Sequence, residues 1–312
     1  MKKYLQNRVA GSRLTLPVTV VIAVVVWLLA GLATSNWWIQ FFCFGLSAYL
    51  MVELNNIHAL IRIYSRMVSC MFLLLGCCAC FMFPSIRGAV LQLCLIGALT
   101  ILFTTYQDKQ APGKTYYAFV LMGLASMAHI QMVWYMPLLW LLMTIYLQSL
   151  SWRTWGASLL GLLTPYWFST LWIAWKEDYT PMVDHLAQLG DLSPTVGFSS
   201  LTMNQIAVFA FVMLLTITGT VHHFHKRHED KMRIRMIYGF FIWLDLMTAV
   251  FIVLQPQHYD WLMRIMIVTT APLIAHYISL TSTRFTNIYS CVLAAITLLL
   301  TVYNLWTSSF LF

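Results

Sequence analysis

Charged side chains are scarce in this sequence. Only 9% of the 312 residues are Asp, Glu, Lys or Arg, whereas soluble domains carry about 25%. Hydrophobic residues make up 61% of the chain, against about 45–50% in soluble domains. So few charges cannot cover the surface of a water-soluble protein of this size, and disorder requires the opposite composition. The composition argues against soluble enzymes, nucleic-acid-binding modules and secreted disulfide scaffolds.

Common catalytic motifs are also absent. The sequence contains no G-x-G-x-x-G or Walker A phosphate loop and no G-x-S-x-G nucleophile motif. These absences remove the support for ATP-driven transport by this chain and for a serine hydrolase. The seven cysteines, including the Cys77–Cys80 pair, all fall inside apolar runs. We interpret them as small membrane-buried side chains rather than disulfides or metal ligands, and we expect no cofactor.

The sequence contains many long apolar runs. A membrane-spanning helix needs about 20 mostly apolar residues. The runs are Leu16–Ala33, Trp37–Val52, Met67–Phe83, Ala89–Tyr106, Thr115–Ala128, Met132–Leu150, Trp155–Trp175, Asn204–Val221, Met236–Leu254, Trp261–Leu280 and Asn287–Trp306. The fifth and sixth form either a tight hairpin around His129 or one helix kinked near Pro137. The prediction is an all-α, polytopic transmembrane helix bundle of about eleven spans, or ten, in a single membrane domain over residues 1–312.

The basic residues predict an orientation, because short cytoplasmic loops are enriched in Lys and Arg. With eleven spans and the N-terminus inside, fifteen of the eighteen Lys and Arg fall on the inner side. Counting residues 115–150 as one span would instead place the most basic loop, residues 222–235, outside. We therefore expect the N-terminus inside and the C-terminus outside. The longest outer loop is then residues 176–203, and the first span is an uncleaved helix.

The outer loops gather residue types that carry chemistry. Loop 176–203 contains Asp184 and His185, and the loop after the ninth run adds His258 and Asp260, with Arg264 one turn further on. Carboxylates and histidines act as acids and bases, and an arginine binds phosphate. We predict the two acids and two histidines as catalytic candidates and Arg264 as a ligand of a phosphorylated head group. The alternative is an ordinary solvated acidic loop.

Polar residues within or beside the spans form a second group of candidates. An ionised group at bilayer depth costs a few kcal/mol, so it usually faces the bundle interior or a partner. Asp245 stands inside an apolar run, and we expect it either to pair with Arg264 or to mark a functional site. Glu53 ends the second span. Arg62 and Arg66 are expected on one face of a helix continuing from it, where they bind an anionic lipid phosphate or snorkel to the head groups.

Four histidines lie close together on the predicted inner side: His222, His223, His225 and His228. His-rich tracts can bind metal. However, the spacing matches no catalytic metal motif, and the cationic neighbours repel a divalent ion. We expect no metal here and predict a basic, pH-sensitive loop that anchors the chain to the cytoplasmic leaflet.

Two stretches stand out, ELNNIHALIRIYSRM at 53–67 and SWRTWGASLLGLLTPYWF at 151–168, with the small-residue segment GLAS at 123–126 between them. Together they resemble an uncharacterised family of bacterial polytopic inner-membrane proteins. The resemblance runs over most of the chain and implies a multi-pass protein of the bacterial inner (plasma) membrane. The motifs of this family carry no assigned chemistry.

A further segment, AFVLMGLASMAHIQMVWYMPLLWLLMTIYL at 118–147, resembles a helix pair of multi-spanning glycosyltransferases that use polyprenyl-phosphate sugars. Membrane polysaccharide polymerases are similar there too. Those transferases typically carry an essential acid in the first outer loop. Here that loop is Thr34-Ser35-Asn36, so the resemblance supplies no catalytic acid at that position.

Three functional hypotheses follow. The first is an enzyme that handles lipid-linked glycan at the outer face, with polyprenyl-phosphate-linked glycan and membrane lipids as partners. The second is a non-catalytic subunit of a larger inner-membrane complex, held to protein partners by the small-residue faces GLASMA at 123–128 and GASLLGLL at 156–163. The third is a transporter or lipid translocase with Asp245 as its proton or ion site.

Overall fold

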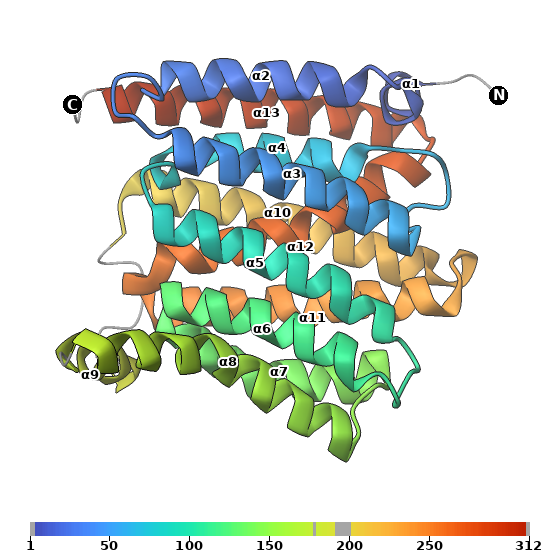
Figure 1. Cartoon of the computed structure of the whole chain (residues 1–312). Coiled ribbons are helices and arrows are strands. Elements are labelled where there is room, and N and C mark those ends of the chain that lie inside the picture. The colour runs from blue at the N-terminus through green and yellow to red at the C-terminus, as the bar shows by residue number, and fades with distance from the viewer. Residues whose placement is uncertain (1–3, 177–178, 191–200, 310–312) are drawn as a thin grey trace.

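The computed structural model describes residues 4–176, 179–190 and 201–309, and every regular element in these ranges is a helix. The predicted all-α fold is therefore confirmed for the described residues. Figure 1 shows the long helices running side by side along one axis, with loops gathered at the two ends of the bundle. The acidic residues Glu177, Asp178 and Asp191 of the predicted outer loop lie outside the described residues.

The N-terminal third begins with a bend of 89° between its first two helices. The elements are α1 (Leu5–Gly11), α2 (Thr15–Leu29), α3 (Trp38–His58), α4 (Met67–Cys78), the 3-10 turn η1 (Cys80–Met82), α5 (Ile86–Leu102) and η2 (Phe103–Thr105). Helix α5 begins at Ile86 because the hydroxyl of Ser85 accepts a hydrogen bond from the backbone N–H of Gly88 and so caps its first turn.

The middle third of the chain decides between the two alternatives for residues 115–150, a hairpin or one kinked helix. Its elements are α6 (Pro112–Ala128), η3 (Ile130–Trp134), α7 (Tyr135–Leu142), η4 (Met143–Leu147), α8 (Trp152–Lys176), α9 (Thr180–Ala187) and η5 (Gln188–Gly190). The chain reverses at the extended residue His129. The carbonyl of Leu147 then accepts a hydrogen bond from the backbone N–H of Gln107, beside the start of α6. Residues 115–150 are thus a hairpin and not one kinked helix.

The C-terminal third contains the longest apolar helices. They are α10 (Met203–Lys226), η6 (Arg227–Glu229), α11 (Met232–Leu254), η7 (Pro256–His258), α12 (Tyr259–Leu280) and α13 (Arg284–Ser309). A reciprocal capping box between Thr202 and Gln205 fixes the start of α10. By length and composition, six helical segments of the described chain are able to cross a membrane, or seven if the bent α1–α2 pair forms one span.

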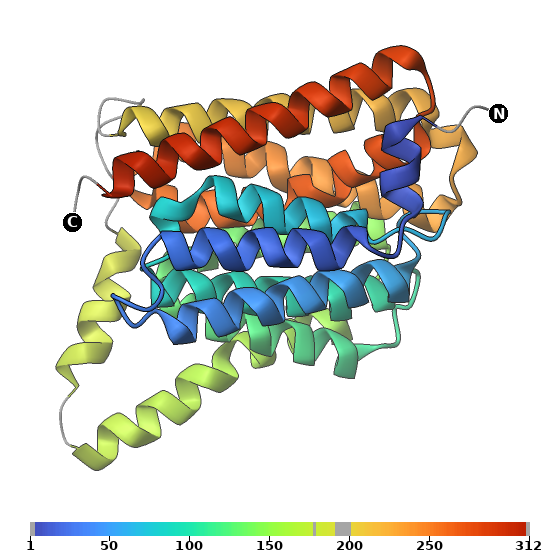
Figure 2. The ribbon, with the colours of Figure 1, turned by 90° about the horizontal axis from the view of Figure 1, so that it is seen from above.

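Helix α12 is the axis of the bundle. Its most apolar stretch is completely buried, whereas only 22% of the corresponding stretch of α13 is buried. Helices α4, α5, α10 and α11 all pack against it, and Figures 1 and 2 show it enclosed by them. In contrast, the second half of α8 leaves the bundle together with α9 (Figure 2), and Trp167, Trp172 and Trp175 are exposed there.

The connections between helices define two ends of the bundle. At one end lie residues 59–66, 106–111, 148–151, 227–231 and 281–283, on the right in Figure 1. We call it the basic end, because most of the described Lys and Arg lie there, including Arg62, which pairs with Glu229 at 2.6 Å. At the other, the pocket end, lie residues 30–37, 79–85, 129–134 and 255–258.

The prediction for Arg62 and Arg66 was wrong in one respect. The helix that contains the second span does not reach the two arginines, because α3 ends at His58 and Ala59 adopts a left-handed conformation with φ 49° and ψ 49°. Residues 59–66 form a loop at the basic end. The two arginines therefore do not share a helical face. Arg62 forms an ion pair with Glu229, and Arg66 donates a hydrogen bond to the hydroxyl of Tyr64 at 3.1 Å.

The two small-residue faces pack on each other inside the chain. A Cβ added to Gly123 of α6 would lie 2.7 Å from the carbonyl oxygen of Leu162 in α8. A Cβ added to Gly161 of α8 would lie 2.5 Å from the carbonyl oxygen of Tyr116 in α6. Glycine at both positions therefore allows the two backbones to approach closely. The faces that were expected to bind another protein are used within this one.

This contact gives a direct prediction. Gly161→Ala is expected to lower the melting temperature in detergent, because its methyl group meets the α6 backbone. Gly156→Ala, in the same helix α8, is the matched control: nothing lies within 4 Å of its added Cβ. There, alanine improves helix propensity by up to about 1 kcal/mol. Equal melting temperatures for the two variants would contradict the packing.

Candidate functional site

A cavity of about 250 Å³ lies at the pocket end, between η3 and α7 on one side and the turn from α11 into α12 on the other. Most of the side chains that line it are aromatic or carry an amide group, and one is an imidazole. The lining residues are Gln131, Trp134, Tyr135, Phe251, Leu254, Gln255, His258, Trp261 and Leu262. We call it the pocket-end cavity. A mostly apolar cavity with a few polar groups is typical of a ligand site.

Charged and titratable groups surround this cavity. His129 stacks beside Trp261, with ring centroids 6.1 Å apart. Burial lowers the pKa of His129 to about 4; the charge of Asp260 opposes this shift, whereas Arg87 and His258 reinforce it. His129 is therefore a neutral imidazole at physiological pH. It offers one hydrogen-bond donor and one acceptor beside the cavity.

Arg264 points away from the cavity, towards α4 and α5. It is 5% exposed, and its guanidinium donates to the backbone carbonyl of Met82 and, at 3.2 Å, to the side chain of Gln92. Its Nε lies 3.7 Å from the carboxylate of Asp260, one turn earlier. Gly88 makes room for this pair, since a Cβ there would lie 2.5 Å from the Arg264 Nε. These contacts hold α12 against α4 and α5.

The predicted catalytic candidates do not converge. His258 lines the pocket-end cavity, and Asp260 lies two residues beyond it but faces Arg264. His185, on α9, lies against Tyr166 of α8 with ring centroids 6.2 Å apart. Asp184, also on α9, is exposed. The link between α9 and the cavity is indirect: the amide of Gln131 donates to the carbonyl of Gln188 in η5 at 3.1 Å.

The intramembrane candidates are also separate from each other. Asp245 is fully buried in the middle of α11 and is hydrogen-bonded to threonine hydroxyls, not to Arg264. The pairing alternative for these two residues is thereby corrected, because the guanidinium of Arg264 binds Met82, Gln92 and Asp260 instead. Glu53 is half-buried on α3 and forms no ion pair with any residue that the structure describes.

At the basic end, two of the four clustered histidines turn into the bundle. His222 and His223 are 8% and 4% exposed, whereas His225 and His228 are exposed to the surroundings. The buried pair lies beside His276 of α12, with ring centroids 5.4 Å and 6.5 Å away. The predicted basic loop is therefore shorter than expected, because His222 and His223 belong to α10, and its anchoring to the leaflet stays a prediction. Among the described residues, no group of three or more His, Cys, Asp or Glu has the geometry of a metal site.

An ion pair at this end joins α12 to the loop between α10 and α11. Nε2 of His276 lies 3.0 Å from Oδ2 of Asp230, and both side chains are 2% exposed. Burial by itself raises the pKa of Asp230, but the hydrogen bond and charge of His276 and the charge of Arg62 outweigh it. The pKa of Asp230 therefore lies below its ordinary value, and the carboxylate is ionised at neutral pH.

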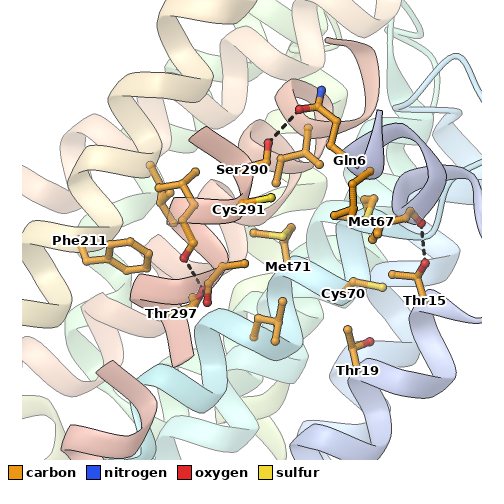
Figure 3. A pocket seen from close by; sticks show the side chains of 17 residues that line it. Gln6, Thr15, Thr19, Met67, Cys70, Met71, Phe211, Ser290, Cys291 and Thr297 are labelled. Carbon is orange, nitrogen blue, oxygen red and sulfur yellow. Dashed lines mark hydrogen bonds between the residues drawn. The ribbon is translucent and has the colours of Figure 1, made fainter. Parts of the chain in front are cut away.

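A second cavity, of about 190 Å³, lies between α1, α2, α4, α10 and α13 (Figure 3). Met67, Met71 and Phe211 line it, and its polar side chains are satisfied locally: the hydroxyl of Ser290 donates to Gln6 and that of Thr297 to the carbonyl of Leu293. Cys291 is exposed at the protein surface, while the other six cysteines are buried and all seven are free. This lining suits hydrocarbon and provides no acid or base, so the pocket-end cavity is the better candidate site.

Sequence reasoning missed most of the pocket-end cavity. Trp134 and Tyr135 belong to the apolar run Met132–Leu150, which the sequence predicts as a span, and Gln131 lies just before that run. The available signal was His129-Ile130-Gln131, a polar interruption between two apolar runs that marks a chain reversal. Comparison with models of protein families, with curated proteins and with solved structures found no match to this chain.

The contacts of Arg264 predict a large loss of stability on shortening its side chain. Arg264→Lys keeps the charge but cannot reach Met82 and Gln92 together, so we expect a loss on the order of 3 kcal/mol in thermal unfolding. Arg87→Lys is the control, because Arg87 is exposed at the same end. Similar unfolding of both variants would contradict the role of Arg264 as an anchor of α12.

The Asp230–His276 pair predicts a pH-dependent contribution. A carboxyl group whose pKa is lowered on folding stabilises the fold above its unfolded pKa of about 4, and this contribution is lost as the pH falls through the folded pKa. Asp230→Asn is therefore expected to lower the melting temperature at pH 7, because it reduces the free energy of unfolding by about 1–3 kcal/mol. In strong acid the variant and the wild type should have the same melting temperature. An unchanged melting temperature at pH 7 would argue against the pair.

Proposed function

We propose that this chain is a multi-spanning protein of a bacterial inner membrane that binds lipid-linked saccharide at its outer face. The observation that carries the proposal is the composition of the pocket-end cavity. It combines four aromatic side chains with two amides and an imidazole: Trp134, Tyr135, Phe251, Trp261, Gln131, Gln255 and His258.

This lining suits a sugar ring. Aromatic side chains offer a large apolar face together with a polar edge, and such faces pack on the C–H bonds of a sugar. Little polar surface faces the cavity, so the amide and imidazole groups supply only a few hydrogen bonds to sugar hydroxyls, and the aromatic faces account for most of the fit. The cavity of about 250 Å³ is smaller than the roughly 300–1,000 Å³ typical of drug-sized ligands. It therefore fits one sugar unit and not an extended glycan.

The proposed topology is eleven crossings with the basic end inside. The connections alternate between the two ends along the chain (Figure 1). Apart from Arg87, Lys176 and Arg264, the described Lys and Arg lie at or near the basic end. Because cytoplasmic loops are enriched in these residues, this distribution supports an outward-facing pocket end, where lipid-linked saccharides that have been exported become available.

Within the site, His258 is the residue we propose as acid or base, because its side chain lines the cavity. Arg264, which the sequence suggested as a phosphate ligand, is already engaged by Met82, Gln92 and Asp260. Arg87 is exposed at the same end and is close enough for its charge to act on His129. We assign the lipid phosphate to Arg87.

The proposal predicts a selective loss of binding. Native mass spectrometry of the chain in nanodiscs measures occupancy during titration with a polyprenyl-phosphate-linked sugar. Trp134→Ala is expected to weaken binding about tenfold, which corresponds to about 1.4 kcal/mol. Trp152→Ala is the matched control, because Trp152 is 82% exposed at the basic end. Equal affinities for wild type and Trp134→Ala would contradict the assignment.

A further inference from the structure

Asp245 sits in a cage of hydroxyl groups in the middle of the bundle. It is 0% exposed. Oδ2 accepts hydrogen bonds from Thr216 of α10 at 2.7 Å and Thr270 of α12 at 2.9 Å, and Oδ1 accepts one from Thr269 of α12 at 2.8 Å. The Thr216 and Thr270 oxygens are 2.8 Å apart. Five oxygen atoms from three helices therefore meet at one point.

No positive charge balances this carboxyl group among the described residues. The ion pairs of the structure engage Arg62, Lys226, Arg264 and His276, none of them with Asp245. The buried histidines lie about two turns away along α10 and α12, roughly 10 Å at 1.5 Å per residue. Between the two levels, Gly219 packs directly against Leu273 and closes the space between α10 and α12.

A carboxylate that is buried at bilayer depth and paired only with neutral groups carries a desolvation cost of several kcal/mol. Three hydroxyl donors offset part of that cost, but they leave the net charge in place. Tyr135 of α7, whose hydroxyl donates to Thr248 at 3.1 Å, supplies no charge, because a tyrosine is ordinarily neutral at physiological pH. The cage therefore requires one bound positive charge.

We propose that Asp245, Thr216, Thr269 and Thr270 form a binding site for a single monovalent cation, a proton or Na⁺. The ligand set contains only oxygen atoms, which hard cations prefer. A divalent ion would leave one uncompensated positive charge in the same apolar surroundings. The oxygen–oxygen distances of 2.7–2.9 Å are those of O–H···O hydrogen bonds, so a proton fits the cage without rearrangement, whereas Na⁺ would require the oxygens to move apart.

The site lies between two openings. A groove of about 520 Å³ separates α10 from α11, and Thr216 contributes both to this groove and to the cage. On another side, Tyr135 contributes both to the pocket-end cavity and to the hydrogen bond with Thr248, one turn from Asp245. A ligand bound in the groove or in the pocket-end cavity would therefore contact residues that also contact the Asp245 cage, and would change cation binding there. The cation site does not depend on the saccharide proposal, because none of its four residues lines the pocket-end cavity.

Infrared spectroscopy of the chain in nanodiscs tests the site directly, in sodium-free and in sodium-containing buffer at pH 7. The expected result is a C=O stretch of a protonated carboxylic acid that disappears in Asp245→Asn and persists in Asp108→Asn, the control at the basic end. Asparagine keeps the shape of the side chain, its amide oxygen accepts from a threonine hydroxyl and its NH₂ donates to a threonine oxygen, so the variant is expected to fold. Thr269→Val, which removes one donor from Oδ1, should shift the same band.

Sodium dependence distinguishes the two cations. If Na⁺ is the ligand, an ionised carboxylate band appears, and added Na⁺ raises the melting temperature of the wild type but not of Asp245→Asn. Either result supports a monovalent-cation site and identifies its occupant. An Asp245 that is ionised and insensitive to Na⁺, or an acid band that survives in Asp245→Asn, would overturn the proposal. Loss of saccharide binding in Trp134→Ala has no bearing on this outcome.

Discussion

The complete enclosure of α12 is the constraint on which the rest of the structure depends. A helix surrounded by other helices has no access to water or lipid head groups, so each polar side chain on it must find its partner inside the bundle. Helix α12 carries such side chains at three levels. Arg264 is satisfied at the pocket end, Thr269 and Thr270 in the middle, and His276 at the basic end.

These three levels fix the neighbours of α12. Arg264 binds the segment between the end of α4 and the start of α5. Thr269 and Thr270 bind Asp245 of α11, and His276 binds Asp230 in the loop after α10. The pocket-end cavity then forms where α12 begins, because Trp261 is held in place between the α6–α7 reversal and the end of α11. The candidate site is thus a consequence of how the buried charges are neutralised.

The sequence predicted the class of fold and the unusual residues but not their partners. Asp245 and Arg264 stand out in apolar runs, and the helical bundle follows from composition. Their partners are far apart in the chain: Thr216 is 29 residues from Asp245, and Gln92 is 172 residues from Arg264. Hydropathy carries no information about such pairings. The same holds for His222 and His223, whose burial depends on packing against α12, and for Ala59, whose left-handed conformation ends α3 although alanine favours helices.

A cryo-EM map of the chain in nanodiscs, supplied with a polyprenyl-phosphate-linked sugar, tests the account of the site most directly. The account predicts a sugar-sized density in the pocket-end cavity, against Trp261 and His258, with its phosphate near Arg87 and its lipid tail leaving along the bundle surface. An empty pocket-end cavity, with the lipid bound only in the groove between α10 and α11 or in the cavity beside α1, would contradict it.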